Sequence, residues 1–203
     1  MGKYNWNTRL IGDKLILVPY RREHVYKYHD WMGGEDLLEL TASERLSLEE
    51  ELEMQQTWRD DENKCTFIVI DKSKLSEEQY YSSTTEGMCG DVNIFVTFDD
   101  ELNQTKGEIE IMVAEKDSRG KGIATEALWM MMRYGMDTLK IDEYEAKILE
   151  QNDASLKLFQ DKMKYIYKRY HKAFGEHWLT YNVKDNKDTI TNKTEHVKTH
   201  TYE

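Results

Sequence analysis

Residues 119–124 read Arg119-Gly120-Lys121-Gly122-Ile123-Ala124, between an apolar run that predicts a strand (108–114) and a run that predicts a helix (125–139). Two glycines in a tight turn let the backbone approach a ligand that a Cβ atom would keep away. The free N–H groups of the first helical turn then converge on one spot, at the positive end of the helix dipole. This strand–turn–helix unit therefore predicts an anion site suited to a pyrophosphate.

Two other phosphate-binding motifs do not fit this stretch. The dinucleotide fingerprint G-x-G-x-x-G requires a third glycine where this chain has Thr125, and the Walker motif G-x-x-x-x-G-K-[ST] is absent. Taken alone, an ordinary glycine-containing turn with basic residues at a helix start explains the stretch equally well, because short glycine motifs recur by chance.

A resemblance to a known family favours the pyrophosphate site. The pattern [QR]-x-x-G-x-[GA] after a strand resembles motif A of the GCN5-related N-acetyltransferases (GNAT), which bind acetyl-CoA, and Asn152-Asp153-Ala154-Ser155 after the expected strand 144–149 resembles its second part. The opening Leu-Ile-Leu-Val-Pro (15–19), followed by His24, Tyr28 and Trp31, resembles the ribosomal-protein N-acetyltransferase-like branch. Further stretches resemble the eukaryotic N-acetyltransferase 9 group: YHDWM (28–32), LTASE (40–44), KCTFIV (64–69), GDVN (90–93) and GEIE (107–110).

The resemblance runs from about residue 8 to 183 and implies a fold. It implies one mixed α/β domain with a mostly antiparallel central sheet of six to seven strands, splayed at the acetyl-CoA wedge and flanked by about four helices. The chain has one proline and no Pro/Gly/Ser linker or internal repeat, which also favours a single domain. Residues 184–203 are polar with few apolar anchors, so we expect a disordered tail there, and residues 1–12 also look irregular.

The amino-acid composition restricts the classes of partner that this chain is expected to bind. Thirty-nine acids against 28 bases give a net charge of −11, which argues against nucleic acid and suits a positively charged amine or merely confers solubility. No apolar run reaches the 18 residues that a membrane span needs and no signal segment opens the chain, so a soluble cytoplasmic protein is expected. Two isolated cysteines are too few for a disulfide framework or a zinc site, and no metal is expected.

Periodicity places the remaining elements. His24, Tyr28 and Trp31 share one helix face, which predicts core packing, and Ser47 with Glu50 forms a capping-box match that predicts a helix to residue 58. Strands are expected at 14–20, 66–71 and 90–98, and a closing hairpin is expected from 165 to 183. Along residues 108–113 the period of two puts Glu108 and Glu110 on one side of the sheet.

The resemblance assigns roles to the site residues. Glu108 and Glu110 are the candidates for a general base, although a paired or solvated sheet edge would explain them too. The cofactor-binding set implied is Met112, Val113 and Ala114 on the strand, Arg119, Gly120, Lys121, Gly122, Ile123, Ala124 and Thr125 in the turn, and Asn152 and Phe159 beyond it. The acceptor wall implied is Thr41, Ser43, Glu44, Asp91 and Asn93, of which Ser43 and Glu44 could equally serve only to cap and solvate a helix start.

Phe159 departs from the family pattern. Many relatives carry a tyrosine at this position, which protonates the leaving thiolate, and phenylalanine cannot donate a proton. Water, another group such as Tyr165 or Tyr181, or unassisted departure would have to replace it.

The function implied is direct transfer of an acetyl group from acetyl-CoA to the N-terminal or lysine amine of a protein. Tubulin and microtubules enter as possible partners, because the resembling group has been linked to them. Two alternatives stay open: a small-amine acetyltransferase of the polyamine type, and a protein that keeps the fold and binds a partner without catalysis.

Overall fold

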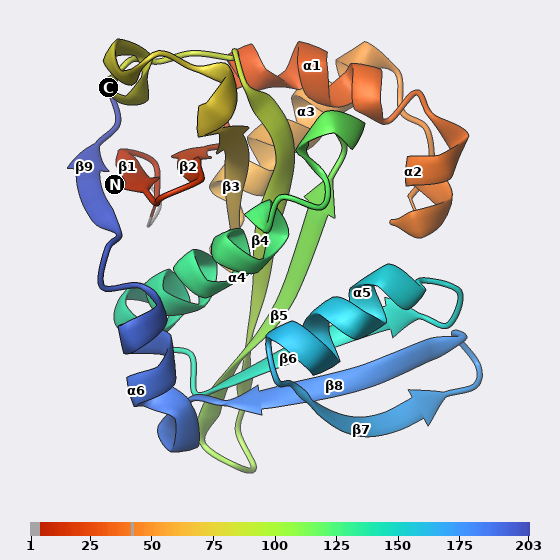
Figure 1. Cartoon of the computed structure of the whole chain (residues 1–203). Helices are drawn as coiled ribbons and strands as arrows, with labels where there is room; N and C mark the ends of the chain where they lie inside the picture. Colours follow the sequence, from red (N-terminus) through yellow and green to blue (C-terminus); the bar gives the residue numbers. More distant parts are fainter. Residues whose placement is uncertain (1–4, 42) are drawn as a thin grey trace.

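The computed structural model describes residues 5–41 and 43–203, and its strands form a single sheet in that part of the chain (Figure 1). The strands are β1 (Thr8–Ile11), β2 (Leu15–Pro19), β3 (Lys64–Asp71), β4 (Met88–Asp99), β5 (Gln104–Val113), β6 (Glu143–Leu149), β7 (Ile166–His171), β8 (Glu176–Asn182) and β9 (Lys198–Thr201). Their order is β7-β8-β6-β5-β4-β3-β2-β1-β9, and only the β5–β6 pair is parallel.

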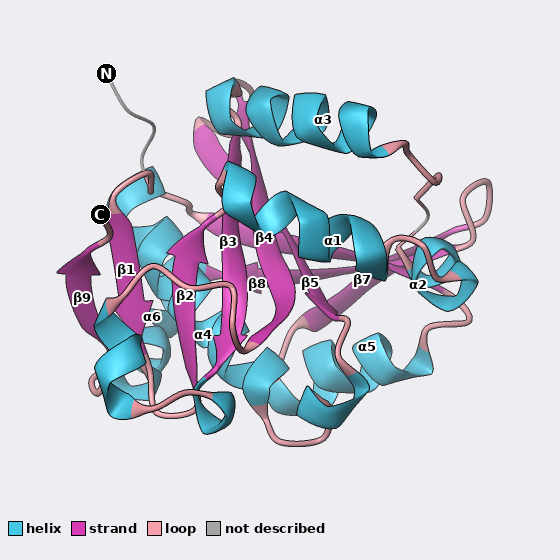
Figure 2. Cartoon of the chain, turned by 90° about the horizontal axis from the view of Figure 1, so that it is seen from above, coloured by secondary structure: helices cyan, strands magenta, loops and turns pink. Residues whose placement is uncertain are grey.

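Helices cover both faces of the sheet (Figures 1 and 2). They are α1 (Val25–Trp31), α2 (Glu35–Leu40), α3 (Leu48–Asp60), α4 (Ile123–Tyr134), α5 (Asp153–Lys157) and α6 (Val183–Lys193), and π-helical turns continue α4 to Leu139 and α5 to Lys162. The mixed, mostly antiparallel fold is confirmed. The expected six to seven strands and four helices were too few: the described residues contain nine strands and six α-helices.

Two apolar cores lie on opposite sides of the sheet. Helices α1 and α3 pack over β2, β3 and β4, where Tyr28 and Trp31 are buried as their spacing predicted. On the other side α4 packs its methionines, Met130, Met131, Met132 and Met136, against the sheet. The capping box of α3 is present as well: the Glu50 N–H donates to Ser47 Oγ at 3.3 Å and the Ser47 N–H donates to the Glu50 carboxylate at 2.8 Å.

The expectation of a disordered tail at residues 184–203 is wrong. Residues 184–203 are ordered: they continue α6 and then form β9, which pairs with β1 at the sheet edge, so the expectation of irregular structure before residue 12 is also wrong at residues 8–11. Tyr202 is 1% exposed and lies between the guanidinium groups of Arg9 and Arg21, at 4.8 and 4.4 Å from its ring centroid. Backbone pairing and one buried aromatic ring order a segment whose composition alone is too polar to predict it.

The two parallel strands separate early. β5 and β6 pair at Lys106–Glu143, Gly107–Tyr144 and Glu108–Glu145, whereas β5 stays paired with β4 as far as Val113. From Ile109 onward, β5 therefore has no paired strand on its β6 side. This is the splay that the family resemblance implied.

Candidate active site

A groove of about 650 Å³ runs between the glycine turn and α5. Most of the expected cofactor residues line it, namely Met112, Val113, Arg119, Gly120, Gly122, Ile123, Ala124, Thr125 and Asn152. Three do not: Ala114 lines an adjoining cavity with α2, Phe159 lines the neighbouring pocket, and Lys121 lines neither cavity. The groove thus brings together the strand end, the turn and the start of α5.

The turn requires both glycines. Gly120 and Gly122 have φ of +74° and +83°, in the region that side chains disfavour, and Gly122 is the N-cap of α4. The loop between β1 and β2 holds the turn from outside: Lys14 Nζ donates to the Lys121 carbonyl at 2.8 Å, and the Glu126 carboxylate accepts the N–H groups of Asp13 and Lys14. A turn held in this way presents its main-chain N–H groups in a fixed geometry.

The two basic side chains of the turn act as braces. Arg119 Nε donates to the Val113 carbonyl at 2.8 Å and its Nη2 donates to the Ala114 carbonyl at 3.2 Å. Lys121 Nζ lies 3.5 Å from Asp71, a carboxylate that also accepts a hydrogen bond from Ser118 Oγ at 2.8 Å. These contacts tie the turn to the end of β5 and to β3, so the turn's main chain is the better candidate for contacting an anion.

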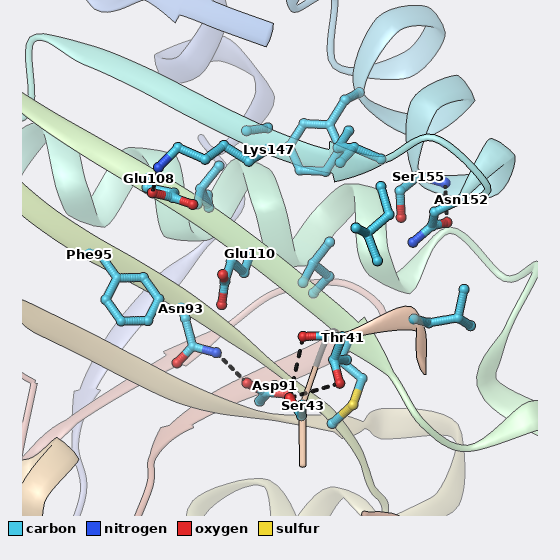
Figure 3. Close-up of a pocket in the computed structure, with 18 of the residues that line it drawn as sticks. Thr41, Ser43, Asp91, Asn93, Phe95, Glu108, Glu110, Lys147, Asn152 and Ser155 are labelled. Atoms are coloured by element: carbon cyan, nitrogen blue, oxygen red, sulfur yellow. Dashed lines mark hydrogen bonds and ion pairs between the residues drawn. The ribbon is translucent and has the colours of Figure 1, made fainter. Parts of the chain in front are cut away.

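A second pocket of about 340 Å³ lies on the α1–α3 side of the sheet and meets the groove (Figure 3). Both cavities are lined by Leu40, Thr41, Ile111, Met112, Asn152 and Ser155. The expected residues Asp91, Asn93, Glu108, Glu110, Thr41 and Ser43 all line this second pocket. The two cavities meet at Met112, close to where β5 ends.

The two carboxylates of β5 differ. Glu108 Oε2 lies 2.5 Å from Lys147 Nζ on the neighbouring strand β6, so its charge is neutralised. Glu110 projects into the pocket with no ion pair among the described residues (Figure 3). The protein around Glu110 displaces solvent and raises the pKa of its carboxyl, with Lys64 opposing the shift and Glu108 adding to it.

Asp91 lies deepest, at 2% exposed. Its Oδ2 accepts a hydrogen bond from Asn93 Nδ2 at 2.5 Å, and Asn93 Oδ1 in turn accepts one from Thr66 Oγ1 at 2.6 Å. Its Oδ1 is buried without a hydrogen-bond partner in the described part of the chain. Burial raises the pKa of Asp91 to about 7; the Asn93 hydrogen bond and Lys64 oppose the shift, and Glu110 adds to it.

Sequence reasoning missed the aromatic and basic side of the pocket. Lys64 Nζ lies 3.1 Å from the ring centroid of Trp58 and 4.0 Å from that of Phe95, a cation–π arrangement. Phe95 follows Asn93 by two residues, so strand periodicity could have placed it on this face. Trp58 reaches the pocket because α3 packs over the sheet, and no local sequence pattern predicts that packing.

Gly90 was also missed as a site residue, although it opens the GDVN stretch. A Cβ there would lie 1.9 Å from the Met112 carbonyl oxygen, a distance that no side chain permits. Next to it, the N–H groups of Ala114 and Glu115 both donate to the Cys89 carbonyl, at 2.8 and 3.2 Å. Gly90 therefore lets β4 and β5 approach closely where the two cavities meet.

Glu44 and Phe159 differ from their expected placement. Glu44 is exposed and lines neither cavity, and Ala42 of the LTASE stretch lies outside the described residues. Phe159 is 3% exposed and packs edge-on against the Tyr165 ring at 5.0 Å. Tyr165 and Tyr181 are themselves buried and line neither cavity, which argues against either as the missing proton donor.

One group of possible cation ligands lies away from the two cavities. Asp13, Glu126 and His196 bring ligand atoms within 4.8 Å of one another, but the Glu126 oxygens already accept two backbone N–H groups. Within the described residues, no helix is long and apolar enough to cross a lipid bilayer.

Comparison with known proteins connects this geometry to a chemistry. Residues 14–161 match the family described as acetyltransferase (GNAT) domain. The chain is 50% identical over 157 residues to an N-acetyltransferase 9-like protein of Nematostella vectensis, covering 77% of each chain. It is 49% identical over 161 residues to the human alpha/beta-tubulin-N-acetyltransferase 9, covering 78% of this chain and 75% of the relative.

Solved structures share the fold at low identity. Mycobacterium smegmatis RimJ in complex with CoA-disulfide superimposes with a TM-score of 0.73 at 14% identity, covering 98% of this chain and 99% of that one. Spermidine N-acetyltransferase from Vibrio cholerae, in complex with CoA and spermine, gives 0.68 at 14% identity, covering 84% and 96%.

Proposed function

Since this chain belongs to the GNAT family of acetyltransferases and transfers an acetyl group from acetyl-CoA to a protein amine, we propose that its acceptor is the N-terminal α-amine of a tubulin chain. The names of three relatives, alpha/beta-tubulin-N-acetyltransferase 9, support this acceptor, which would place the activity in the cytoplasm on microtubule subunits. The observation that carries the proposed site is the meeting of the two cavities at Met112, one beside the glycine turn and one lined by carboxylates.

The groove fits acetyl-CoA. The turn's main-chain N–H groups would hold the pyrophosphate, because both glycines give the turn its positive-φ conformation and the side chains of Arg119 and Lys121 are engaged elsewhere. The edge of β5 around Met112, which has no paired strand on its β6 side, would hold the pantetheine arm. Asn152 would approach the arm with its NH₂ group, since its side-chain oxygen caps α5 through the Ser155 N–H at 3.1 Å. Acetyl-CoA, when bound, supplies an activated thioester.

The acceptor pocket supplies the base. Of the two β5 carboxylates, Glu110 is better suited to accept a proton than Glu108, which Lys147 neutralises. A main-chain N–H near Met112 would stabilise the oxyanion that forms as the amine attacks. The thiolate, with a pKa of about 8.5, leaves without help from Phe159 and takes a proton from the attacking nitrogen.

The chemistry favours an α-amine over lysine. At pH 7 a lysine with a pKa near 10.4 requires about 4.6 kcal/mol to become neutral, whereas an α-amine near 7.7–8.0 requires only about 1–1.4 kcal/mol. A carboxylate base can therefore deprotonate an α-amine more easily than a lysine, because less free energy is required. The polyamine-type alternative is not favoured, because its structural support comes at 14% identity and concerns the fold alone.

Acetyl-CoA turnover against matched peptides tests the proposal. We expect peptides with the N-terminal sequences of tubulin chains to be acetylated at the α-amine, including when every internal lysine is blocked. The same peptides with a pre-acetylated N-terminus should be inert, and spermidine should give negligible turnover. Robust spermidine acetylation, or activity only on internal lysines, would contradict an α-amine acceptor.

A further inference from the structure

Asp91 is more deeply buried than either acid on β5, and it lines the carboxylate pocket close to where that pocket meets the groove. On β4 it is directly opposite Met112, and Asn93 is directly opposite Glu110. Opposite residues in antiparallel strands point to the same side of the sheet, so Asp91 and Glu110 are diagonal neighbours on the pocket face. Figure 3 shows both carboxylates with Asn93 between them.

Only one oxygen of Asp91 is satisfied within the protein. Asn93 donates to Oδ2, and Thr66 holds Asn93 in that orientation, so the carboxylate is fixed. Asp91 lines the pocket, and its Oδ1 is buried without a hydrogen-bond partner in the described residues. A buried carboxylate oxygen without a hydrogen bond is costly, and such atoms call for an explanation in a native fold. An N–H group of the substrate would complete it.

We propose that Asp91 is a catalytic residue whose Oδ1 receives the acceptor α-ammonium and takes its proton, with Glu110 passing that proton to solvent. This deepens the proposed function and rests on it. Asp91 is the inner acceptor, next to Met112, and Glu110 lies at the solvent-accessible side of the same pocket. Glu108 stays bound to Lys147 and takes no part in the transfer.

The step balances. One N–H bond of the ammonium breaks and an O–H bond forms on Asp91, which leaves a neutral amine and a neutral carboxylic acid. The amine nitrogen then forms a bond to the thioester carbon while the C–S bond breaks, and the nitrogen gives a second proton to the departing sulfur. The proton held by Asp91 leaves through Glu110, so the products are an amide, CoA thiol and one proton.

The environment of Asp91 suits this task. Its pKa of about 7 lies roughly one unit below that of an α-amine, whereas an ordinary aspartate lies about four units below. Burial accounts for most of this rise in pKa; the Asn93 hydrogen bond lowers the pKa, Glu110 raises it and Lys64 lowers it. The other titratable groups near the site are Tyr20, Tyr28, Glu51, Glu108, Lys147 and Glu176.

Asp91→Asn is the direct test, because asparagine keeps an oxygen for the Asn93 amide and only removes the base. With an α-amine peptide at pH 7 we expect kcat to fall at least 100-fold while acetyl-CoA affinity, measured by calorimetry, stays at the wild-type value. The deficit should shrink toward pH 9.5, where the amine is already neutral. Asp99→Asn, a carboxylate on the same strand that pairs with Lys106 at the distant hairpin, is the matched control and should keep wild-type kcat.

A wild-type pH profile and kcat in Asp91→Asn would overturn the proposal, and so would a loss that is independent of pH. A wild-type enzyme that acetylates none of the α-amine peptides would instead contradict the proposed function. If the variant does not fold, aspartate ¹³Cγ NMR of the wild type gives the answer. We expect one carboxyl that titrates near neutral pH to shift when an acceptor peptide binds; the absence of such a resonance, or a resonance unmoved by peptide, would refute the role.

Discussion

Gly90 and Gly122 show how a missing side chain shapes the site. Gly90 lets β4 approach the Met112 carbonyl, and Gly122, with φ of +83°, gives the turn a backbone conformation that side chains disfavour and leaves room for Lys14 Nζ, which a Cβ would meet at 2.7 Å. Asp91 and Glu110 then place charge beside that opening. At this scale the backbone creates the space and the carboxylates supply the chemistry.

Gly122→Glu should abolish acetyl-CoA binding, since a side chain at a φ of +83° strains the turn and crowds Lys14, and the added negative charge beside the groove repels the pyrophosphate. Calorimetric affinity measures this. Gly122→Gln separates bulk from charge, and Gly175→Glu is the matched control, because Gly175 has a similar φ of +64° on the β7–β8 hairpin away from the groove. Correctly folded Gly122→Glu with unchanged affinity would refute the pyrophosphate assignment.

Glu110→Gln should lower kcat at least tenfold at pH 7 without weakening acetyl-CoA binding. Glu108→Gln should have the smaller effect, because Lys147 already neutralises Glu108. The loss should diminish as the pH rises, since more of the amine is then neutral. Glu101→Gln on the exposed β4–β5 hairpin is the control. Wild-type turnover by both single variants and by the double variant would mean that neither carboxylate handles a proton.

Among the elements, the sheet edge formed by β1 and β9 stands out because its two strands come from opposite ends of the chain. β9 pairs with β1 over four residues, and Tyr202 then closes over Arg9 and Arg21 with its hydroxyl 3.0 Å from Ser83 Oγ. This edge also reaches the loop between β1 and β2, whose backbone holds Glu126 next to the glycine turn. The C-terminal strand thus supports the cofactor side of the molecule.

Tyr202→Ala should therefore destabilise the whole chain. Removing a buried aromatic side chain costs about 3–5 kcal/mol, which corresponds to a fall in Tm of about 10 °C for a domain of this size. Tyr26→Ala, at a tyrosine that is 55% exposed, should leave Tm nearly unchanged in the same calorimetric scan. Equal Tm values for the two variants would show that β9 and Tyr202 contribute little to stability.

At the scale of the whole molecule, the buried carboxyl of Asp91 lowers the folding stability at neutral pH. Asp91 is more easily protonated in the folded state, with a pKa of about 7, than in the unfolded chain, where the value is near 3.8. Folding therefore favours the neutral form, and stability falls as the pH rises from about 4 to 7 and stays lowest above pH 7. A site that must accept a proton is a site that destabilises its own charged state.

Asp91→Asn should accordingly be more stable than wild type above pH 7, by at least about 1 kcal/mol or 2–4 °C in Tm, and close to wild type at pH 4. Tm measured at both pH values checks the sign. Asp99→Asn should behave oppositely near neutral pH, because the Lys106 hydrogen bond lowers the pKa of Asp99 and its charge is favoured in the folded state. A uniform change in Tm at both pH values would contradict this linkage.

Much of the fold was predictable because it is encoded locally. The two glycines, the period of two along β5 and the capping box of α3 each act within a few residues, and each is present as expected. The period of two also placed Glu108 and Glu110 on one side of the sheet before any strand pairing was known, whereas the β4–β5 register put Asp91 and Asn93 beside them.

The tertiary structure decided which of these groups is free to act. Strand register put Lys147 beside Glu108 and left Glu110 without an ion pair in the described chain, and burial with the Asn93–Thr66 network raised the pKa of Asp91. The C-terminal segment was misjudged because its order comes from pairing with β1, about 190 residues away in the chain. Register, burial and long-range pairing arise only when distant segments meet, so local sequence patterns do not contain them.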